Sequence, residues 1–493
     1  MICHRRSSCR PPGAAALPAW IRIVTLIIVC LSLCTHGSAQ SWTLAWSDEF
    51  SGTAGSVPST ANWTYDTGIL NVNNEAEYYC SPGSNTAPCD ANNSNAYLDG
   101  NGHLIIQAIR INSGTAAYSG SWTSARLKTD TLQSFQYGRL ESSMSLPVGP
   151  GLWPAYWALG TNLNTVGWPA SGEIDFMENV PASSGLGPST ISSTLHGGNS
   201  SSDCYCGGNG LGQRYTFPAN DPNGPDVTSF HTYGAIWSAN MVQFYVDDPN
   251  NIFFVRTTSD VPSGLSWDFN HPFFVILNLA VGGTGSWPGP PDNTTPSPAV
   301  MTVDYVRWYT PSAVPGPSMT ATPITVTAGQ GGTSSVDLSS TQGTGRVYLA
   351  CSTDAPKAAC SVNTSDPLNQ YTVDFSKSAT GGATVNLTTT ANTSAALISP
   401  RHGLPSGWMA FCGMMLVGLL LLPPGRRGKV RLGAAMILLL ALLPSCGSSN
   451  SSSVPPPDNG TPPGSYTITV SVYTVSNSTG SADSTVSIPL TVK

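Results

Sequence analysis

The sequence predicts an all-β protein, and three observations lead to that prediction. Only 10% of the 493 residues are charged, whereas glycine (50 residues) and proline (40 residues) are abundant, so little material exists for long soluble helices. Turn signals such as Asp99-Gly100-Asn101-Gly102 run directly into apolar stretches of strand length, here residues 104–109. Aromatic residues thin out after Pro311, where threonine, serine, valine and glycine dominate. We therefore expect two different β regions, over residues 40–312 and 313–395.

The first 39 residues are typical of an export signal. Several arginines precede an apolar stretch from Ile23 to Cys34, and Gly37-Ser38-Ala39 offers small residues for cleavage before Gln40. We expect residues 1–39 to be a signal peptide and the protein to be exported, to the periplasm or the medium. An uncleaved membrane anchor is the alternative.

The run Glu173-Ile174-Asp175-Phe176-Met177-Glu178 predicts a short buried strand that carries three acids, because turn residues flank it on both sides. Alternation places Glu173 and Asp175 on one face, and a β-bulge at Phe176-Met177 would return Glu178 to that face. Like charges this close are costly unless some stay protonated or the site uses them. Two carboxyls about 5–5.5 Å apart would suit a retaining glycosidase. A calcium site or a solvated edge strand is the alternative.

Aromatic residues surround this strand in sequence, and sugar rings have apolar faces, so a carbohydrate groove is indicated. Nearby segments are Asn73-Asn74-Glu75, Tyr78-Tyr79, Tyr137-Gly138-Arg139, Gly151-Leu152-Trp153-Pro154-Ala155-Tyr156-Trp157 and Gly167-Trp168-Pro169. Together they resemble glycoside hydrolase family 16 in its laminarinase-like branch. Further matches are Trp46-Ser47-Asp48-Glu49-Phe50, Ser124-Ala125-Arg126, Thr194-Leu195-His196-Gly197, Phe230-His231-Thr232-Tyr233, 277–283 and 303–309. The resemblance spans more than half of the chain, and the extra Met177 is typical of the family's β-1,3-glucanases rather than its lichenases.

The resemblance implies a β-jelly-roll sandwich of two antiparallel sheets whose concave face binds a β-glucan. It implies a retaining endo-1,3-β-glucanase with Glu173 as nucleophile, Glu178 as general acid/base and Asp175 as the supporting acid. The implied sugar contacts are Asn73, Arg139, Trp153, Trp157, Trp168 and His196. No cofactor is implied for catalysis, although a structural calcium near Glu49 and Asp304 is. Mixed-linkage glucan or galactan cleavage, a non-hydrolytic glucan-binding protein and an adhesion protein remain alternatives.

Charge and cysteine usage narrow the function further. The net charge of −7 and the absence of a basic stripe argue against nucleic acid as a partner. Export makes disulfides expected, and Cys80–Cys89 is the first choice among the pairings of Cys80, Cys89, Cys204 and Cys206. No histidine or further cysteine completes a zinc pattern at the last two.

The second half of the chain predicts a small immunoglobulin-like β region. Alternating stretches occur between Met319 and Thr393, and Cys351 and Cys360 are near enough to pair. After a Ser/Pro/Gly linker over 448–463, residues 464–493 contain two more strands. Because an isolated hairpin is marginal in water, we expect these strands to complete the same sandwich or to pair with a neighbouring chain.

A hydrophobic hairpin over residues 408–445 interrupts this β region. Two apolar arms, Trp408–Leu422 and Gly433–Leu443, flank a short loop that carries four basic residues. Each arm is short for a full span, but a basic loop between them follows the positive-inside rule. We expect a transmembrane helical hairpin that tethers the protein, with both flanks on the exported side; a buried core hairpin is the alternative.

Overall fold

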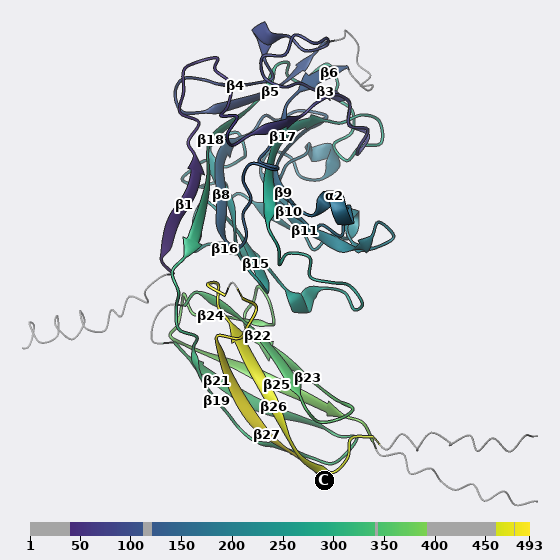
Figure 1. Cartoon of the computed structure of the whole chain (residues 1–493), viewed down its shortest axis with the longest axis vertical. Coiled ribbons are helices and arrows are strands. Elements are labelled where there is room, and N and C mark those ends of the chain that lie inside the picture. Colours follow the sequence, from purple (N-terminus) through teal and green to yellow (C-terminus); the bar gives the residue numbers. More distant parts are fainter. Residues whose placement is uncertain (1–39, 112–120, 341–343, 392–459, 478) are drawn as a thin grey trace, which may run out of the picture.

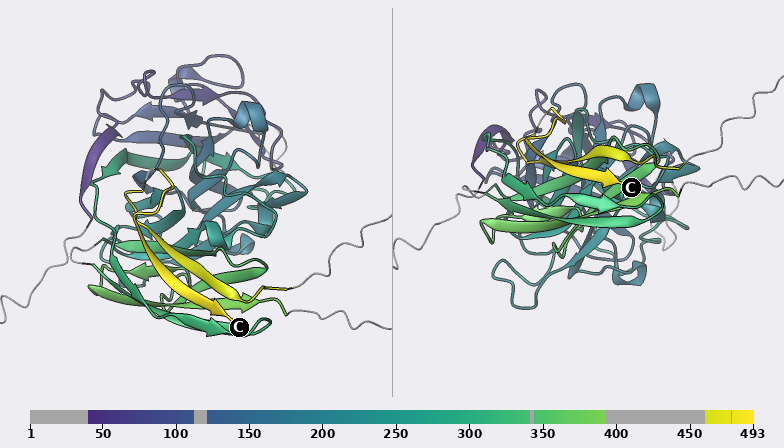
Figure 2. Two further views of the ribbon diagram at one scale, coloured as in Figure 1. Left: turned by 60° about the horizontal axis from the view of Figure 1, so that its bottom comes forward. Right: turned by 90° about the horizontal axis from the view of Figure 1, so that it is seen from below.

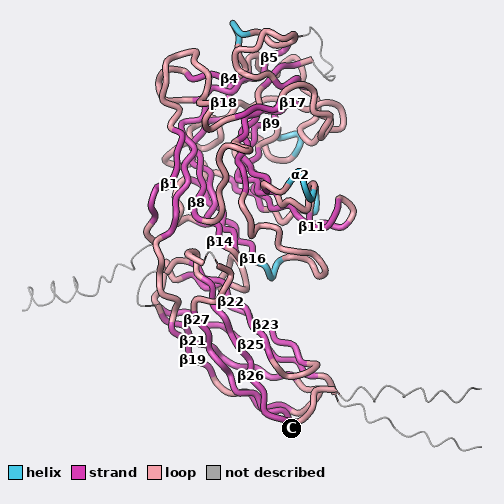
Figure 3. Tube along the Cα trace, viewed as in Figure 1, coloured by secondary structure: helices cyan, strands magenta, loops and turns pink. Residues whose placement is uncertain are grey.

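A computed structural model describes residues 40–111, 121–340, 344–391, 460–477 and 479–493 (Figure 1). The predicted leader 1–39, the hairpin 408–445 and the linker up to residue 459 lie outside them. The all-β prediction is confirmed for the described residues, whose few helices are short (Figure 3). These are α2 (Leu163–Val166), η1 (Ala91–Asn93), η2 (Ala182–Ser184), η3 (Gly207–Asn209) and η4 (Thr258–Asp260). None of the helices in this described part has the length and apolarity needed to cross a membrane.

The first sheet has ten strands, and β1 (Trp42–Asp48) and β4 (Ala96–Leu98) join it beside its main path. That path runs β16 (Ile252–Thr257), β15 (Met241–Val246), β14 (His231–Ser238), β8 (Gly138–Ser145), β18 (Ala299–Pro311), β5 (Leu104–Arg110), β6 (Trp122–Ser124) and β3 (Glu77–Tyr79). β1 pairs with β18, and β4 pairs with β5.

The second sheet has eight strands and carries the acidic segment at its centre. Its path runs β12 (Asp203–Tyr205), β11 (Thr190–Ser200), β10 (Glu173–Glu178), β9 (Leu152–Gly160), β17 (Phe273–Val281), β7 (Arg126–Lys128) and β2 (Thr64–Asp66), and β13 (Gln213–Thr216) pairs with β11. The two sheets share one large apolar core, into which alternate residues of β17 pack, from Phe273 to Val281. Tyr156 and Phe176 stack there with ring centroids 4.5 Å apart. This packing leaves the polar side chains of β10 and β11 on the opposite face, where the site lies.

Two further sheets form a second sandwich. One has the order β19 (Ser318–Ala321), β21 (Gly331–Ser339), β25 (Thr380–Thr389) and β23 (Ala358–Thr364); the other has β20 (Ile324–Val326), β27 (Ser484–Val492), β26 (Gly464–Tyr473), β22 (Arg346–Thr353) and β24 (Thr372–Asp374). The C-terminal strands β26 and β27 thus complete this sandwich, one of the two arrangements left open by the sequence. Their inward residues share one core with β21, β22 and β25.

The two sandwiches are packed against each other, as two views show (Figures 1 and 2). Ile236, Met241, Tyr245 and Val255 of the first sandwich form one buried cluster with residues of the second. The hydroxyl of Tyr348 in that cluster hydrogen-bonds the hydroxyls of Thr258 and Ser259, each at 2.9 Å. The contact is therefore apolar at its centre and hydrogen-bonded at its side.

Three disulfides are present among the described residues. Cys80–Cys89 and Cys351–Cys360 are bonded, as the sequence led us to expect. Cys204 and Cys206 are also bonded, to each other, in the hairpin that follows β11. Neither of these two cysteines is left as a thiolate ligand for a metal.

Candidate active site

Strand β10 contains the bulge that its sequence predicts. Against β9, Asp175 pairs with Trp157 whereas Met177 pairs with Tyr156, so Phe176 is the extra residue. Against β11, the register shifts between Asp175, opposite Thr194, and Glu178, opposite Ser192. The extra residue restores Glu178 to the face that carries Glu173 and Asp175. All three carboxyls line one small cavity below the groove.

Each glutamate accepts a hydrogen bond from an indole. The Nε1 of Trp168 donates to Oε2 of Glu173 at 2.6 Å, and the Nε1 of Trp153 donates to Oε1 of Glu178 at 3.0 Å. A rigid ring donor fixes the direction of a carboxylate and favours its charged form. The two tryptophans therefore orient the two glutamates from opposite sides of Asp175.

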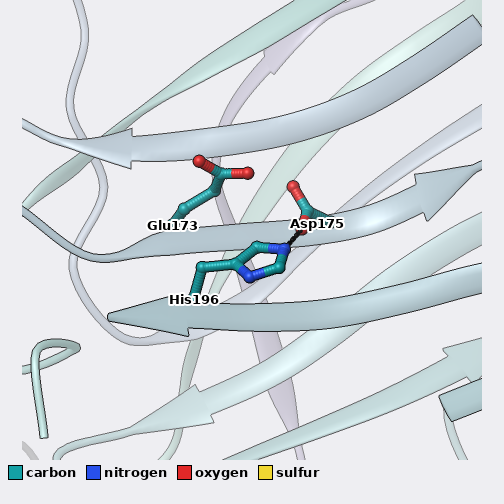
Figure 4. A group of neighbouring side chains, drawn as sticks. All are labelled: Glu173, Asp175 and His196. Carbon is teal, nitrogen blue, oxygen red and sulfur yellow. Dashed lines mark ion pairs between the residues drawn. The ribbon is translucent and has the colours of Figure 1, made fainter. Parts of the chain in front are cut away.

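Asp175 lies on β10 beside Glu173 and faces His196 (Figure 4). Its side chain is almost fully buried, and Nε2 of His196 lies 3.1 Å from its Oδ2. His196 comes from β11, directly opposite Glu173. Donor and acceptor atoms of Glu173, Asp175 and His196 all lie within 4.8 Å of one another. Protons in this cluster are consequently shared among close neighbours.

Burial makes all three carboxyls weaker acids, and repulsion by Asp175 adds to the effect on the two glutamates. Burial and the charge of Asp175 raise the pKa of Glu173 to about 8, while His196 and the Trp168 indole act in the opposite direction. Burial raises the pKa of Asp175 to about 7. Burial and the charge of Asp175 hold the pKa of Glu178 well above its usual value, against the opposing effect of His196. Near neutral pH the group therefore retains at least one proton.

These pKa shifts predict how stability depends on pH. Glu178, whose pKa is raised by burial in the folded state, favours folding below its unfolded pKa near 4.5, and this contribution is lost as pH rises above that value. Glu178→Gln cannot ionise, so its melting temperature should match the wild type near pH 4.5 and exceed it by roughly 2–4 °C at pH 8, about 1 kcal/mol for a partly solvated group. Thermal melts across this range measure the difference.

In a matched control variant, Glu49→Gln, stability relative to the wild type should change with pH in the opposite direction. The hydrogen bond from Arg307 lowers the pKa of Glu49, so Glu49→Gln should lose stability above about pH 4.5. If the melting temperatures of Glu178→Gln and the wild type differ by the same amount at pH 4.5 and at pH 8, ionisation of Glu178 does not destabilise the folded protein.

A groove of about 780 Å³ opens above the carboxyls and crosses strands β9, β10, β11 and β13. The predicted sugar contacts Asn73, Trp153, Trp168 and His196 all line it. Asn73 also donates to Glu75, which accepts a second bond from Tyr79 and so braces the loop. The structure thus brings four of the six predicted contacts together around the acids.

Trp157 lies in the floor of the site. It lines the cavity of about 50 Å³ beneath the three carboxyls, with Arg126 stacked 4.7 Å above its ring. Its indole donates to Asn278 at 2.7 Å, and Asn278 in turn donates to Tyr79. Asn278, which the sequence leaves unassigned, is therefore a groove-floor residue that holds Trp157 in place.

The prediction for Arg139 is wrong. This residue lies on β8 in the other sheet, where its guanidinium stacks 3.9 Å above the ring of Tyr309 and makes an ion pair with Glu141. It lines a different cavity, between the two sandwiches, together with Trp42 and Arg346. The family resemblance implied a sugar contact here, but β8 pairs with β14 and β18 rather than with the groove strands.

The groove residues missed in the sequence include three with long side chains. Trp287 lines the groove beside Trp153, with ring centroids 5.6 Å apart and nearly perpendicular planes. Gln213 and Arg214 line the other end, on β13. The Gly285-Ser286-Trp287-Pro288-Gly289 turn repeats the Trp-Pro pattern of the acidic region and is a usable signal, whereas nothing local marks Arg214.

Glu49, one of the two acids near which a structural calcium is predicted, makes an ion pair with Arg307. Both carboxylate oxygens of Glu49 accept hydrogen bonds from Arg307, at 2.9 and 2.7 Å. Among the described residues, neither acid belongs to a group of three acidic, histidine or cysteine ligands close enough to hold an ion. The donor set at this position thus supports an ion pair.

An all-β sandwich that presents paired carboxyls and tryptophans in one groove defines a carbohydrate-active class of protein. The model of glycosyl hydrolases family 16 matches residues 84–307. The chain is 34% identical over 302 residues to the beta-glucanase of Rhodothermus marinus, a match that covers 58% of this chain and 92% of that protein. The chain belongs to glycoside hydrolase family 16.

Other relatives extend well beyond the matched region. Identity is 33% over 299 residues with the clotting factor G alpha subunit of Tachypleus tridentatus and 32% over 285 residues with glucan endo-1,3-beta-glucosidase A1 of Niallia circulans. These matches cover 60% and 56% of this chain, but only 38% and 39% of the two relatives. A solved endo-beta-1,3-glucanase from Pyrococcus furiosus is 38% identical, with 56% of this chain and 97% of that one covered and a TM-score of 0.46.

Proposed function

We propose that this protein is a retaining, endo-acting glycoside hydrolase that cleaves β-1,3-glucan of the laminarin type. One observation carries the proposal: the bulge in β10 directs Glu173, Asp175 and Glu178 into one groove, where each glutamate is held by its own indole. The linkage is supported by relatives named as glucan endo-1,3-beta-glucosidases, from Niallia circulans and Cryptopygus antarcticus. The groove crosses four strands, which supports binding of a chain rather than a chain end.

The reaction proceeds in two displacements. In the first, a carboxylate oxygen of Glu173 bonds to the anomeric carbon while the glycosidic oxygen leaves with the proton of Glu178. In the second, Glu178 removes a proton from water, whose oxygen bonds to the anomeric carbon and releases Glu173. Two inversions at one carbon return the β configuration.

The electrostatics of the site support the acid/base role of Glu178. The raised pKa of Glu178 suits a group that must donate a proton near neutral pH. Glu173 must be ionised to attack; burial and Asp175 raise its pKa and oppose this, whereas the Trp168 indole and His196 stabilise its charged form. Asp175, within reach of Glu173 and His196, keeps the protons distributed between them. The proposed steps use side chains of this chain alone, so they need no cofactor.

Hydrolysis assays on the full-length protein test the proposal. Laminarin, lichenan, agarose and κ-carrageenan are incubated with the wild type and with Glu173→Ala, and product size and anomeric form are followed. We expect oligosaccharides from laminarin that first appear as the β-anomer, and none with Glu173→Ala. Cleavage of one of the other polymers but not of laminarin would mean that the substrate proposal is wrong. No cleavage of any polymer by the folded protein would favour a glucan-binding protein. Activity that EDTA abolishes would favour a cation at the acidic cluster.

We also infer that the protein is exported and tethered to a membrane through residues 408–445, and that its second, immunoglobulin-like sandwich acts as a spacer. One contact supports the tether: Thr461 donates its backbone N–H to Thr390 at 2.9 Å, so the chain leaves and re-enters the sandwich at one place. A segment inserted there has both flanks on the same side, as a hairpin requires. Membrane fractionation of cells expressing the full chain, or the chain without 408–445, tests the tether. Equal membrane association of the two would rule it out.

A further inference from the structure

Arg214 lies in the same row of side chains as Glu178. Across the sheet, Glu178 of β10 pairs with Ser192 of β11, and Ser192 pairs with Arg214 of β13. Residues directly opposite each other in antiparallel strands point to the same face. Arg214 therefore emerges on the groove face, where it lines the same groove as Glu173 and Glu178.

The spacing of this row matches the length of a polysaccharide chain. Neighbouring strands are about 4.8 Å apart, so two ladder steps place the backbone of Arg214 roughly 10 Å from that of Glu178, comparable to a disaccharide. Because the groove crosses the strands, a glucan that passes Glu178 toward β11 next reaches β13. Trp153 and Trp287 occupy the opposite end, on the far side of Glu178.

The local structure keeps this end of the groove open and holds Arg214 in place. A Cβ on Gly210 would lie 2.5 Å from Cε1 of His196, so only glycine lets the 207–212 segment lie flat beside the groove floor. One guanidinium nitrogen of Arg214 donates to the carbonyl of Gly185 at 2.9 Å, which anchors the side chain. A planar guanidinium carries five N–H donors in a fixed fork, which suits paired hydroxyl oxygens of a sugar.

We propose that Arg214 forms a glucan-binding subsite about two sugar units from the scissile bond, on the β11 side of Glu178. It binds hydroxyls of a neutral glucosyl unit and makes cleavage dependent on chain length. Within the described part of the chain, Arg214 is the lysine or arginine that lines the wide groove above the acids. The inference rests on the proposed glucanase function for its ligand, but binding can be measured without hydrolysis.

Binding of laminari-oligosaccharides to the inactive Glu173→Ala protein tests the subsite directly. We expect Arg214→Ala in that background to weaken laminarihexaose about 10-fold, the loss typical of one charge-assisted hydrogen-bonding group at a partly solvated site, and laminaritriose less than about 2-fold. Arg214→Lys retains the positive charge but not the forked set of N–H donors. Its affinity for laminarihexaose should therefore lie between the affinities of the Arg214 and Arg214→Ala proteins. Lys377→Ala removes an exposed cation outside the groove and should change neither affinity. Titration calorimetry gives the dissociation constants, and melting temperatures confirm that each variant is folded.

The possible outcomes distinguish a failure of the Arg214 subsite from a failure of the proposed glucanase activity. Equal weakening of hexaose and triose, or no weakening of either, would overturn the subsite even if the wild type cleaves laminarin. A hexaose-specific loss would support it even if the wild type hydrolyses nothing, in which case only the catalytic proposal fails. In an active enzyme, Arg214→Ala should also change which bond of laminarihexaose is cut.

Discussion

Azide should give opposite anomers of the product in the Glu173→Ala and Glu178→Ala variants. Without the nucleophile, azide enters the space left by Glu173 and displaces an activated aryl leaving group directly, which yields the α-glycosyl azide. Without the acid/base, Glu173 still forms the glycosyl-enzyme from such a substrate, and azide then attacks from the other face to give the β-azide. Chromatography and NMR of the products distinguish the two, and thereby order the two glutamates.

The same variants should lose nearly all hydrolysis of laminarin. We expect a fall in kcat of roughly 10³-fold or more for Glu173→Ala and of about 10²–10⁴-fold for Glu178→Ala. Asp175→Asn is the control, because Asp175 lies between the glutamates without attacking or protonating the sugar; azide should not restore its activity. An α-azide from Glu178→Ala would reverse the proposed roles.

Tyr348→Ala is expected to separate the unfolding of the two sandwiches. Only 4% of Tyr348 is exposed, its ring stacks on Tyr473, and its hydroxyl bonds Thr258 and Ser259 across the contact. Removing a buried aromatic side chain costs about 3–5 kcal/mol. In calorimetry the wild type should therefore melt in one transition, and the variant in two, the earlier at a clearly lower temperature.

Two control variants define the cause of this effect. Tyr348→Phe keeps the ring and loses only the hydroxyl bonds, so it should cost about 1 kcal/mol and leave a single transition. Tyr466→Ala changes a tyrosine of the same sandwich that bonds Pro462 away from the contact, and should not separate the transitions. A single, unshifted transition for Tyr348→Ala would mean that this contact does not couple the two units.

Local pattern was enough to predict the acidic strand. Side-chain alternation and the odd, three-residue spacing between Asp175 and Glu178 called for a bulge, and the structure places one extra residue, Phe176, there. The Cys80–Cys89 pairing was equally accessible, because few residues separate the two cysteines. Both inferences depend on residues within ten positions of each other, over which strand geometry is nearly independent of the rest of the fold.

The groove depended on strands that are far apart in sequence. Arg214 reaches it because β13 pairs with β11, and Trp287 reaches it from the turn after β17, neither of which the chain order of the motifs reveals. Arg139 fails for the same reason: its strand pairs within the other sheet. The function of Trp153 and Trp168 as donors to particular glutamates likewise required their packed positions.

By itself, the sequence determined the β character of the chain, the acidic strand with its bulge and the family, since composition, alternation and motif spacing are local properties of the chain. Tertiary structure alone decided which side chains share the groove, where Arg139 lies, and that β26 and β27 return to complete the second sandwich. Strand pairing between distant segments is selected by burial of whole sheet faces. Because that burial involves the complete core, no single stretch of sequence determines which strands pair.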